Sequence, residues 1–440
     1  MKEKGILAII TIGLAIRIAL ALTLPWSVPT DESSHLNHII YTATNWRLPT
    51  ASSVCLPAAI SIYTSAFSLD ANDVVVLQES CKMEFGQPPV YYTVAALVYT
   101  GASLFGSASA FYSLRILSVL FSVAAIVIGY KTIHLLTQNR TVLVSSALMM
   151  AFTPKLLETS AGINNDQLSW LFSATAIYCI VLGNRKTGFL SAFAVLTKLT
   201  CIPVAIGGMF SLLLRKEMKQ ALAYLSVFSV MTLWLFTWNA IVWNSPTVLH
   251  PPTPVPLSSL REYLMPNFRA LAGLQATPTN IANLFQAQIK PNVVSSNMVS
   301  LFSFWFNSHT ISAWPHHLGA WTLFWGTVVM TLTLMVLLGI YASYRSIPRG
   351  VFYTFLAIMA LFIVEMNLAA FEVSLRANGR LFYPLLPIVA FFFGSGTGFV
   401  ATKMLARKVF QMEKSNVIGL SLSASESQQQ RRESEIHGGR

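Results

Sequence analysis

The stretch GILAIITIGLAIRIALALTL, residues 5–24, is an apolar run with a single charged residue, Arg17. At a rise of 1.5 Å per residue, about 20 residues of helix cross the hydrocarbon core of a bilayer. Backbone groups in lipid must find partners within the same segment, so this run is expected to be a membrane-spanning helix. No small-residue cleavage site clearly follows it, which indicates a retained helix rather than a signal peptide. Arg17 is expected either to snorkel or to face the helix bundle.

The composition of the whole chain agrees with this first segment. Of the 440 residues, 54% are hydrophobic and only 10% are charged, and the mean hydropathy is +0.59. Soluble domains carry about 25% charged residues, so the sequence predicts an all-α polytopic membrane protein. The net charge of +12 does not indicate a nucleic-acid partner, because the basic residues are scattered between apolar runs, as in cytoplasmic loops of membrane proteins.

Further apolar runs and their basic flanks predict about ten transmembrane helices, with both termini cytoplasmic. Residues 89–105 are rich in Tyr, Thr, Ser and Gly and are expected to lie at the interface, although a crossing stays open. Residues 189–214 are basic at both ends, which favours two short helices that meet near Lys198. The remaining runs cover residues 116–136, 142–157, 168–182, 221–243, 318–343, 351–371 and 381–402.

Two long segments, residues 25–88 and 244–315, face the outer, non-cytoplasmic side in this topology, and both are expected to contain interfacial helices. The second segment is rich in Pro and Asn, and its prolines exclude long helices. The membrane-embedded domain is expected to cover residues 1–410. Residues 411–440 are rich in Ser, Gln and Arg and predict a disordered cytoplasmic tail.

Polar and charged residues gather on the outer side of this predicted topology. Asp31 and Glu32 stand side by side after the first helix, with His35 one helical turn further on. An ionisable group at the bilayer centre costs about 2.5–3.5 kcal/mol on insertion scales, so the expected position of Lys198 indicates a polar cavity. Acids offer general bases or metal ligands, and Lys and Arg bind phosphate, so the site suits a lipid phosphate. The other candidates are Gln87, Tyr91, Asn165, Asp166, Arg376, Arg380 and Tyr383.

Each candidate also has a plainer interpretation. Asp31 and Asp166 can simply cap helix N-termini, where a negative charge favours the helix dipole. His35 can be an ordinary interfacial side chain, and Lys198 and Arg380 can snorkel toward the headgroups. A functional site is favoured by the combination, in which acids, a lysine and arginines converge on one membrane face.

The ordered series of motifs resembles the C-superfamily of glycosyltransferases, which use polyprenyl-phosphate sugars. Within it, the chain is most similar to the protein-mannosyltransferase and aminoarabinose-transferase branch and to a related group of uncharacterised membrane proteins. Gln87 departs from the common histidine, and residues 302–314 follow the Phe-Trp-Gly pattern of the uncharacterised group only loosely. The motifs are Asp31-Glu32-Ser33-Ser34-His35, Gln87-Pro88-Pro89-Val90-Tyr91-Tyr92, Arg115-Ile116-Leu117-Ser118, Asn164-Asn165-Asp166, Leu196-Thr197-Lys198 and Gly379-Arg380.

The resemblance implies transfer of a sugar from a polyprenyl-phosphate donor to an acceptor hydroxyl on the non-cytoplasmic side of a bacterial or archaeal plasma membrane, with inversion at the anomeric carbon. It implies that Asp31 is the general base, that Glu32 orients the acceptor or helps to hold a divalent cation, and that Asp166 positions sugar or acceptor. Lys198 and Arg380 would neutralise the leaving phosphate. The residues expected to contact substrate are His35, Gln87, Tyr91, Asn165, Lys198, Arg376, Arg380 and Tyr383.

Two other functions stay open at this stage. A transporter or lipid flippase would use the same charged cavity for passage, although no inverted repeat of the kind that transporters often contain is apparent. A catalytically inactive membrane scaffold is the other. The sequence does not identify the sugar, the acceptor (glycan, lipid or protein) or any metal requirement. Cys55 and Cys81 would pair only in an oxidising compartment, and their pairing is left open.

Overall fold

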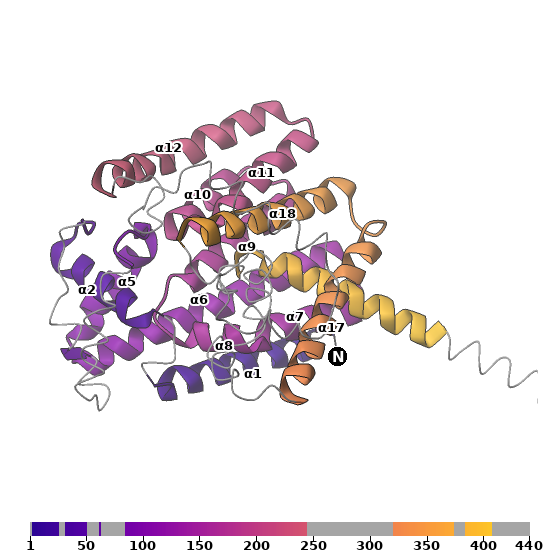
Figure 1. Ribbon diagram of the computed structural model, residues 1–440, viewed down its shortest axis with the longest axis horizontal. Helices are drawn as coiled ribbons and strands as arrows, with labels where there is room; N and C mark the ends of the chain where they lie inside the picture. The colour runs from indigo at the N-terminus through magenta and orange to yellow at the C-terminus, as the bar shows by residue number, and fades with distance from the viewer. Residues whose placement is uncertain are drawn as a thin grey trace, which may run out of the picture.

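The protein is a bundle of helices in the computed structural model, with no strand among the described residues (Figure 1). The structure describes residues 2–25, 31–50, 61–62, 84–243, 320–373 and 383–406, without the side chains of 2–3, 320–326 and 366–373. The second outer segment, the tail, Cys55, Cys81, Arg376 and Arg380 lie outside these residues, and the division at residue 410 stays a prediction.

Four helices of the described chain are long and apolar enough to cross a membrane, or five if one bent pair counts as a single span. The predicted class, an all-α polytopic membrane protein, is confirmed, while the number of crossings stays a prediction. The four are α1 (Lys2–Thr23), α6 (Ser107–Leu136), α12 (Met218–Trp243) and the helix over Tyr383–Ala406. The other long helices are α2 (Glu32–Asn45), α5 (Pro89–Ser103), α9 (Asp166–Leu182), α17 (Ala320–Ser343) and α18 (Arg349–Val373).

The run over residues 142–157 is not one straight helix but a bent pair of helices, which together are long and apolar enough for one crossing. It forms α7 (Arg140–Phe152) and α8 (Pro154–Ala161), which are bent by 48° at Thr153. The physical reason is Pro154, which has no backbone N–H and therefore cannot bond the Met150 carbonyl one turn earlier. The bend leaves carbonyl groups at the end of α7 that need partners elsewhere.

Arg17 of α1 supplies those partners. Its guanidinium is fully buried and donates to the carbonyl oxygens of Ala151 at 2.7 Å and Met150 at 3.3 Å. Its Nε also donates to Ser122 Oγ of α6 at 3.0 Å. A cation at a helix C-terminus is favoured by the helix dipole. Arg17 therefore faces the bundle rather than the headgroups, and it joins three helices at the bend.

The expected break near Lys198 is confirmed. Helix α10 (Thr187–Thr197) ends at Lys198, whose φ of −156° and ψ of 128° are extended. A short 3-10 turn, η1 (Leu199–Cys201), then leads into α11 (Ile202–Leu214), which has Pro203 in its first turn. Lys198 thus lies in the gap between two short helices, where its backbone is free of helical geometry.

Helix α6 runs through the centre of the bundle and packs against α1, α5, α7, α8 and α9. Helices α17 and Tyr383–Ala406 cross almost backbone to backbone, because a Cβ on Gly339 would strike the Phe392 carbonyl and one on Gly396 the Met335 carbonyl. Small residues at such crossings let transmembrane helices approach closely. This packing holds the C-terminal helix against the bundle beside α7 and α17 (Figure 1).

We expect Arg17→Met to lower the unfolding free energy by about 2–4 kcal/mol, because it leaves two buried carbonyls without donors. Thermal unfolding of the purified full chain in detergent measures the loss. The exposed Arg185→Met is the matched control and should change stability little. Pro154→Ala should reduce the loss in a double-mutant cycle, because a backbone N–H at position 154 can bond the Met150 carbonyl. Equal effects of Arg17→Met and Arg185→Met would contradict the capping role.

Candidate active site

Glu32 is anchored by a buried ion pair with Arg115 of α6. Arg115 donates from Nε to Glu32 Oε1 at 2.8 Å and from the terminal nitrogen Nη2 to Oε2 at 2.6 Å, and both side chains are fully enclosed. Its Nη1 donates to the carbonyls of Ala21 at 3.1 Å and Leu24 at 2.8 Å, at the end of α1. The Ile163 N–H also donates to Glu32 Oε1, at 2.9 Å. Both carboxylate oxygens of Glu32 are therefore engaged within the protein.

Asp31, directly before this anchor, occupies the N-cap position of α2. Its φ of 62° and ψ of 12° are left-handed, a conformation that non-glycine residues adopt at a cost, and its side chain makes no capping hydrogen bond. The position that simple capping predicts is therefore confirmed, but the capping contact is not made.

The predicted Asn-Asp element forms the start of α9. Asn164 Oδ1 accepts the Asp166 N–H at 3.0 Å, and Asp166 is the first helical residue rather than the N-cap, which is Asn165. The capping alternative for Asp166 is thus wrong. Its carboxylate instead accepts a hydrogen bond from Lys198 Nζ in a buried ion pair. Lys198 does not snorkel, because it reaches inward from the break between α10 and α11.

Asn165 links this ion pair to the start of α5. Its amide nitrogen donates to Gln87 Oε1 at 3.2 Å and to the Thr197 carbonyl at 3.3 Å. Thr197 is the last residue of α10, so Asn165 also bonds a carbonyl at the helix break. Three motifs that are distant in sequence therefore meet here, carrying Gln87, Asn165 and Lys198.

Tyr91 and Tyr92, on the first turn of α5, lie among the acids. His35 Nδ1 and the Tyr92 hydroxyl are 2.8 Å apart, and both rings are buried. Burial raises the pKa of the Tyr92 hydroxyl well above its usual value, and the negative charges of Glu84, Asp166 and Asp31 raise it further. Burial likewise raises the pKa of the Tyr91 hydroxyl, and the negative charges of Glu32 and Asp166 raise it further. The charges of Asp31 and Asp166 thus both act on Tyr92, and the charges of Glu32 and Asp166 both act on Tyr91.

His38, which the sequence did not single out, stacks on Tyr92 with ring centroids 3.4 Å apart. Its Nδ1 donates to the Glu84 carbonyl at 2.9 Å. Burial lowers the pKa of His38 to about 3, so the imidazole is neutral across the physiological range. His38 therefore contributes a neutral ring that packs on Tyr92, and it adds no charge to the site.

Tyr383 packs in a different hydrophobic cluster from Tyr91 and Tyr92. It is fully buried in the largest apolar cluster, together with Trp170, Phe362 and Phe391. Arg376 and Arg380, which precede it, lie outside the described residues. The motifs that carry Glu32, Gln87, Arg115 and Asn165 meet in the structure, and Lys198 joins them through Asp166. The position of Arg376 and Arg380 relative to these motifs stays a prediction.

Sequence reasoning missed several polar residues at the site. Arg115 was noted only as the opening of a helix motif, although a charge inside an apolar run is a signal for a buried partner. Gln167, next to Asp166, is fully buried, and neither of its amide atoms has a hydrogen-bond partner. The Trp170 indole N–H, one turn further along α9, also lacks one. Within the described segments, no group of three or more His, Cys, Asp or Glu side chains could hold a metal ion.

Three solved structures share a distant likeness with the chain. One is an oligosaccharyltransferase from Archaeoglobus fulgidus in the apo form (13% identity, TM-score 0.49, 92% of this chain). Another is the archaeal oligosaccharyltransferase AglB from Archaeoglobus fulgidus in complex with an inhibitory peptide and a dolichol-phosphate (16% identity, TM-score 0.49, 94% of this chain). The chain spans 52% of the length of either. The third is ArnT from Cupriavidus metallidurans bound to undecaprenyl phosphate (14% identity, TM-score 0.38, 92% of this chain and 79% of that one). At these values the likenesses are too distant to indicate what this chain binds.

The sequence gives a firmer indication over part of its length. No curated protein matches the chain at a significant level. A family model does match, over residues 86–243, which run from the start of α5 to the end of α12 and include Arg115, Asp166 and Lys198. Its description is dolichyl-phosphate-mannose-protein mannosyltransferase. Over this segment, the chain shows the resemblance to the C-superfamily glycosyltransferases that its motifs predict.

Proposed function

We propose that the protein transfers a sugar from a polyprenyl-phosphate donor to an acceptor hydroxyl, with inversion, on the non-cytoplasmic side of a bacterial or archaeal plasma membrane. Both termini would then be cytoplasmic. The observation that carries the proposal is the buried ion pair of Lys198 with Asp166, whose negative charge, like that of Asp31, acts on the Tyr92 hydroxyl at the start of α5. The match to a family that uses a lipid-phosphate mannose supports the class of donor.

Asp31 is proposed as the general base. The acceptor hydroxyl would give its proton to the Asp31 carboxylate while its oxygen bonds the anomeric carbon. The bond from that carbon to the phosphate oxygen would break, and the electron pair would leave with the polyprenyl phosphate. Asp31 suits this role because its negative charge acts on the Tyr92 hydroxyl, which bonds His35 at the start of α5.

Lys198 is proposed to neutralise the phosphate as it leaves. Charge builds on the phosphate in the transition state, and a preorganised cation in a water-poor site stabilises it strongly. Lys198 is preorganised because it is buried and held by Asp166. Asp166 would position the lysine as well as sugar or acceptor. Arg380 is proposed as a second cation on the phosphate.

Glu32 is proposed to act through position rather than by contact with the acceptor. Its oxygens are engaged by Arg115 and by the Ile163 N–H, so it fixes the backbone from which Asp31 projects. Because both oxygens are already engaged, Glu32 is not proposed as a metal ligand. The residues proposed to contact donor or acceptor are His35, Gln87, Tyr91, Asn165, Arg376 and Tyr383.

Asp31→Asn should lower sugar transfer by about 100- to 10,000-fold, the usual contribution of a general base. The assay incubates the detergent-solubilised full chain with radiolabelled polyprenyl-phosphate mannose and counts covalent label on acceptors from host membranes. Expression, size-exclusion profile and thermal unfolding should match the wild type, because the Asp31 side chain makes no capping bond. Near-wild-type transfer by Asp31→Asn would contradict the assignment of the base. Donor translocated by the wild type without covalent label would favour a transporter.

Lys198→Met should reduce transfer by about 100-fold or more and raise the donor KM, because a phosphate ligand is lost. Lys155→Met is the matched control, since Lys155 is equally buried and pairs with Glu158 at 2.7 Å within α8. Both variants break a buried ion pair, so both should lose thermal stability. Only Lys198→Met should change the donor KM, and a similar change in Lys155→Met would show that the effect is structural.

A further inference from the structure

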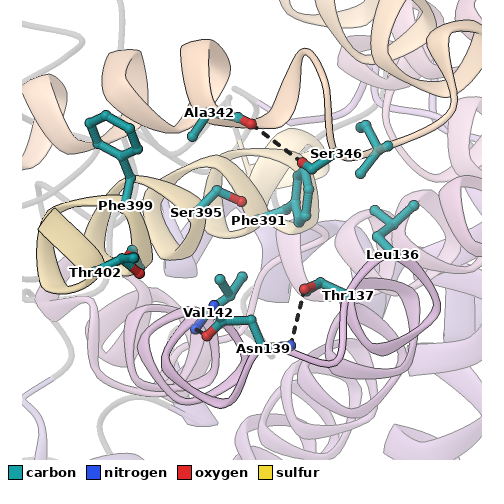
Figure 2. A pocket seen from close by; sticks show the side chains of 12 residues that line it. Leu136, Thr137, Asn139, Val142, Ala342, Ser346, Phe391, Ser395, Phe399 and Thr402 are labelled. Carbon is teal, nitrogen blue, oxygen red and sulfur yellow. Dashed lines mark hydrogen bonds between the residues drawn. The ribbon is translucent and has the colours of Figure 1, made fainter. Parts of the chain in front are cut away.

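A cavity of about 250 Å³ lies between the C-terminal helix and the ends of three other helices (Figure 2). Its apolar walls include Leu136 at the end of α6, Val142 of α7 and Phe391 of the C-terminal helix. Hydroxyl groups line the same space from several elements, among them Thr137 and Ser395. The cavity therefore offers both apolar surface and hydrogen-bonding groups.

This cavity lies at the opposite end of α6 from the candidate active site. Arg115, which holds Glu32, is near the start of α6, and Leu136 is its last residue. The 21 residues between them span about 32 Å of helix, close to the roughly 30 Å thickness of the hydrocarbon core. If the active site lies at one membrane surface, the cavity lies at headgroup depth on the other.

Three cations, here called the rim cations, stand next in sequence to residues that line this cavity. Arg140 follows the lining residue Asn139, Arg345 precedes Ser346, and Lys403 follows Thr402; all three cations are exposed. Lys403 Nζ lies 5.9 Å from the centroid of the Phe399 ring, which lines the cavity. The segments that bring these residues, 131–152, 340–352 and 386–406, contain no Asp or Glu. None of the three cations has a carboxylate partner in the described part of the chain.

We propose that this cavity binds one anionic phospholipid of the cytoplasmic leaflet. The headgroup end would enter the cavity, where the phosphate lies beside Arg140, Arg345 and Lys403 and an acyl chain follows the apolar wall. A volume of about 250 Å³ is just below the roughly 300–1,000 Å³ of pockets that enclose a whole drug-sized ligand, so it seats part of a lipid. Thr137 Oγ1 accepts the Asn139 N–H at 3.1 Å, which leaves its own hydroxyl hydrogen for a lipid oxygen.

The chemistry favours a lipid over a soluble anion. A basic pocket between transmembrane helices at the cytoplasmic surface is a general site for anionic headgroups. The cations are attracted by the negative surface potential of the membrane, and the acyl chain of the lipid packs against the apolar walls. A soluble anion would use the cations but not the walls formed by Leu136, Val142 and Phe391. The cavity shares no residue with the active site, and only its assignment to the cytoplasmic leaflet rests on the proposed function, which puts the active site on the outer side.

The test is native mass spectrometry of the full chain, released from neutral detergent that contains equal amounts of phosphatidylglycerol and phosphatidylcholine with identical acyl chains. We expect retained phosphatidylglycerol to exceed phosphatidylcholine by about tenfold. The triple variant Arg140→Gln/Arg345→Gln/Lys403→Gln should lose this preference. The matched control Arg185→Gln/Lys186→Gln/Lys219→Gln removes three exposed cations that are not next in sequence to any lining residue, and it should keep the preference.

A second variant separates the cavity from surface charge alone. Ser395→Phe fills the cavity but leaves every rim cation in place, and it should also abolish the preference for phosphatidylglycerol. Equal retention of the two lipids by the wild type would overturn the proposal. So would equal losses in the two triple variants, or full retention by Ser395→Phe. Thermal unfolding in phosphatidylcholine and detergent checks that each variant is folded.

Discussion

The arrangement of the candidate site depends on one buried interaction, the bidentate pair between Arg115 and Glu32. It joins the end of α1, the start of α2, the middle of the bundle through α6, and the loop before α9. A buried ion pair is costly to desolvate, and removing one partner leaves an uncompensated charge that costs about 3–5 kcal/mol. Here Glu32 Oε1 and Arg115 Nη1 are also bonded to backbone, so the pair fixes the position of the segments around it as well as contributing to stability.

The same logic explains why Lys198 sits at a break in a helix. An uninterrupted helix over residues 187–214 would point each side chain along its own helical path and use every backbone carbonyl within the helix. The extended backbone at Lys198 frees the Thr197 carbonyl, which accepts from Asn165, and lets the lysine reach Asp166. The local loss of helical bonds is offset by a polar network that connects α5, α9 and α10.

The sequence allowed most helices to be predicted, because membrane length and apolar composition leave few alternatives to a helix. It also indicated the break at Lys198 through basic residues at both ends of one apolar run. It did not reveal the bend at Pro154, although the proline is visible, since a proline can start a helix as well as end one. The partner of Glu32, 83 residues away, depends on how α1, α2 and α6 pack, which no local pattern encodes.

Charge is used in opposite ways at the two ends of α6. At the candidate active site, Glu32, Arg115, Asp166 and Lys198 are buried, and each is bound to an opposite charge. At the other end, Arg140, Arg345 and Lys403 are exposed, and each is next in sequence to a residue that lines the cavity. Enclosed charges need partners from the protein itself because water cannot reach them, whereas exposed cations gain theirs from solvent or the membrane. The two ends of α6 therefore differ for one reason. Buried charges must be paired within the protein, which preorganises the candidate active site, whereas exposed cations stay available to a lipid.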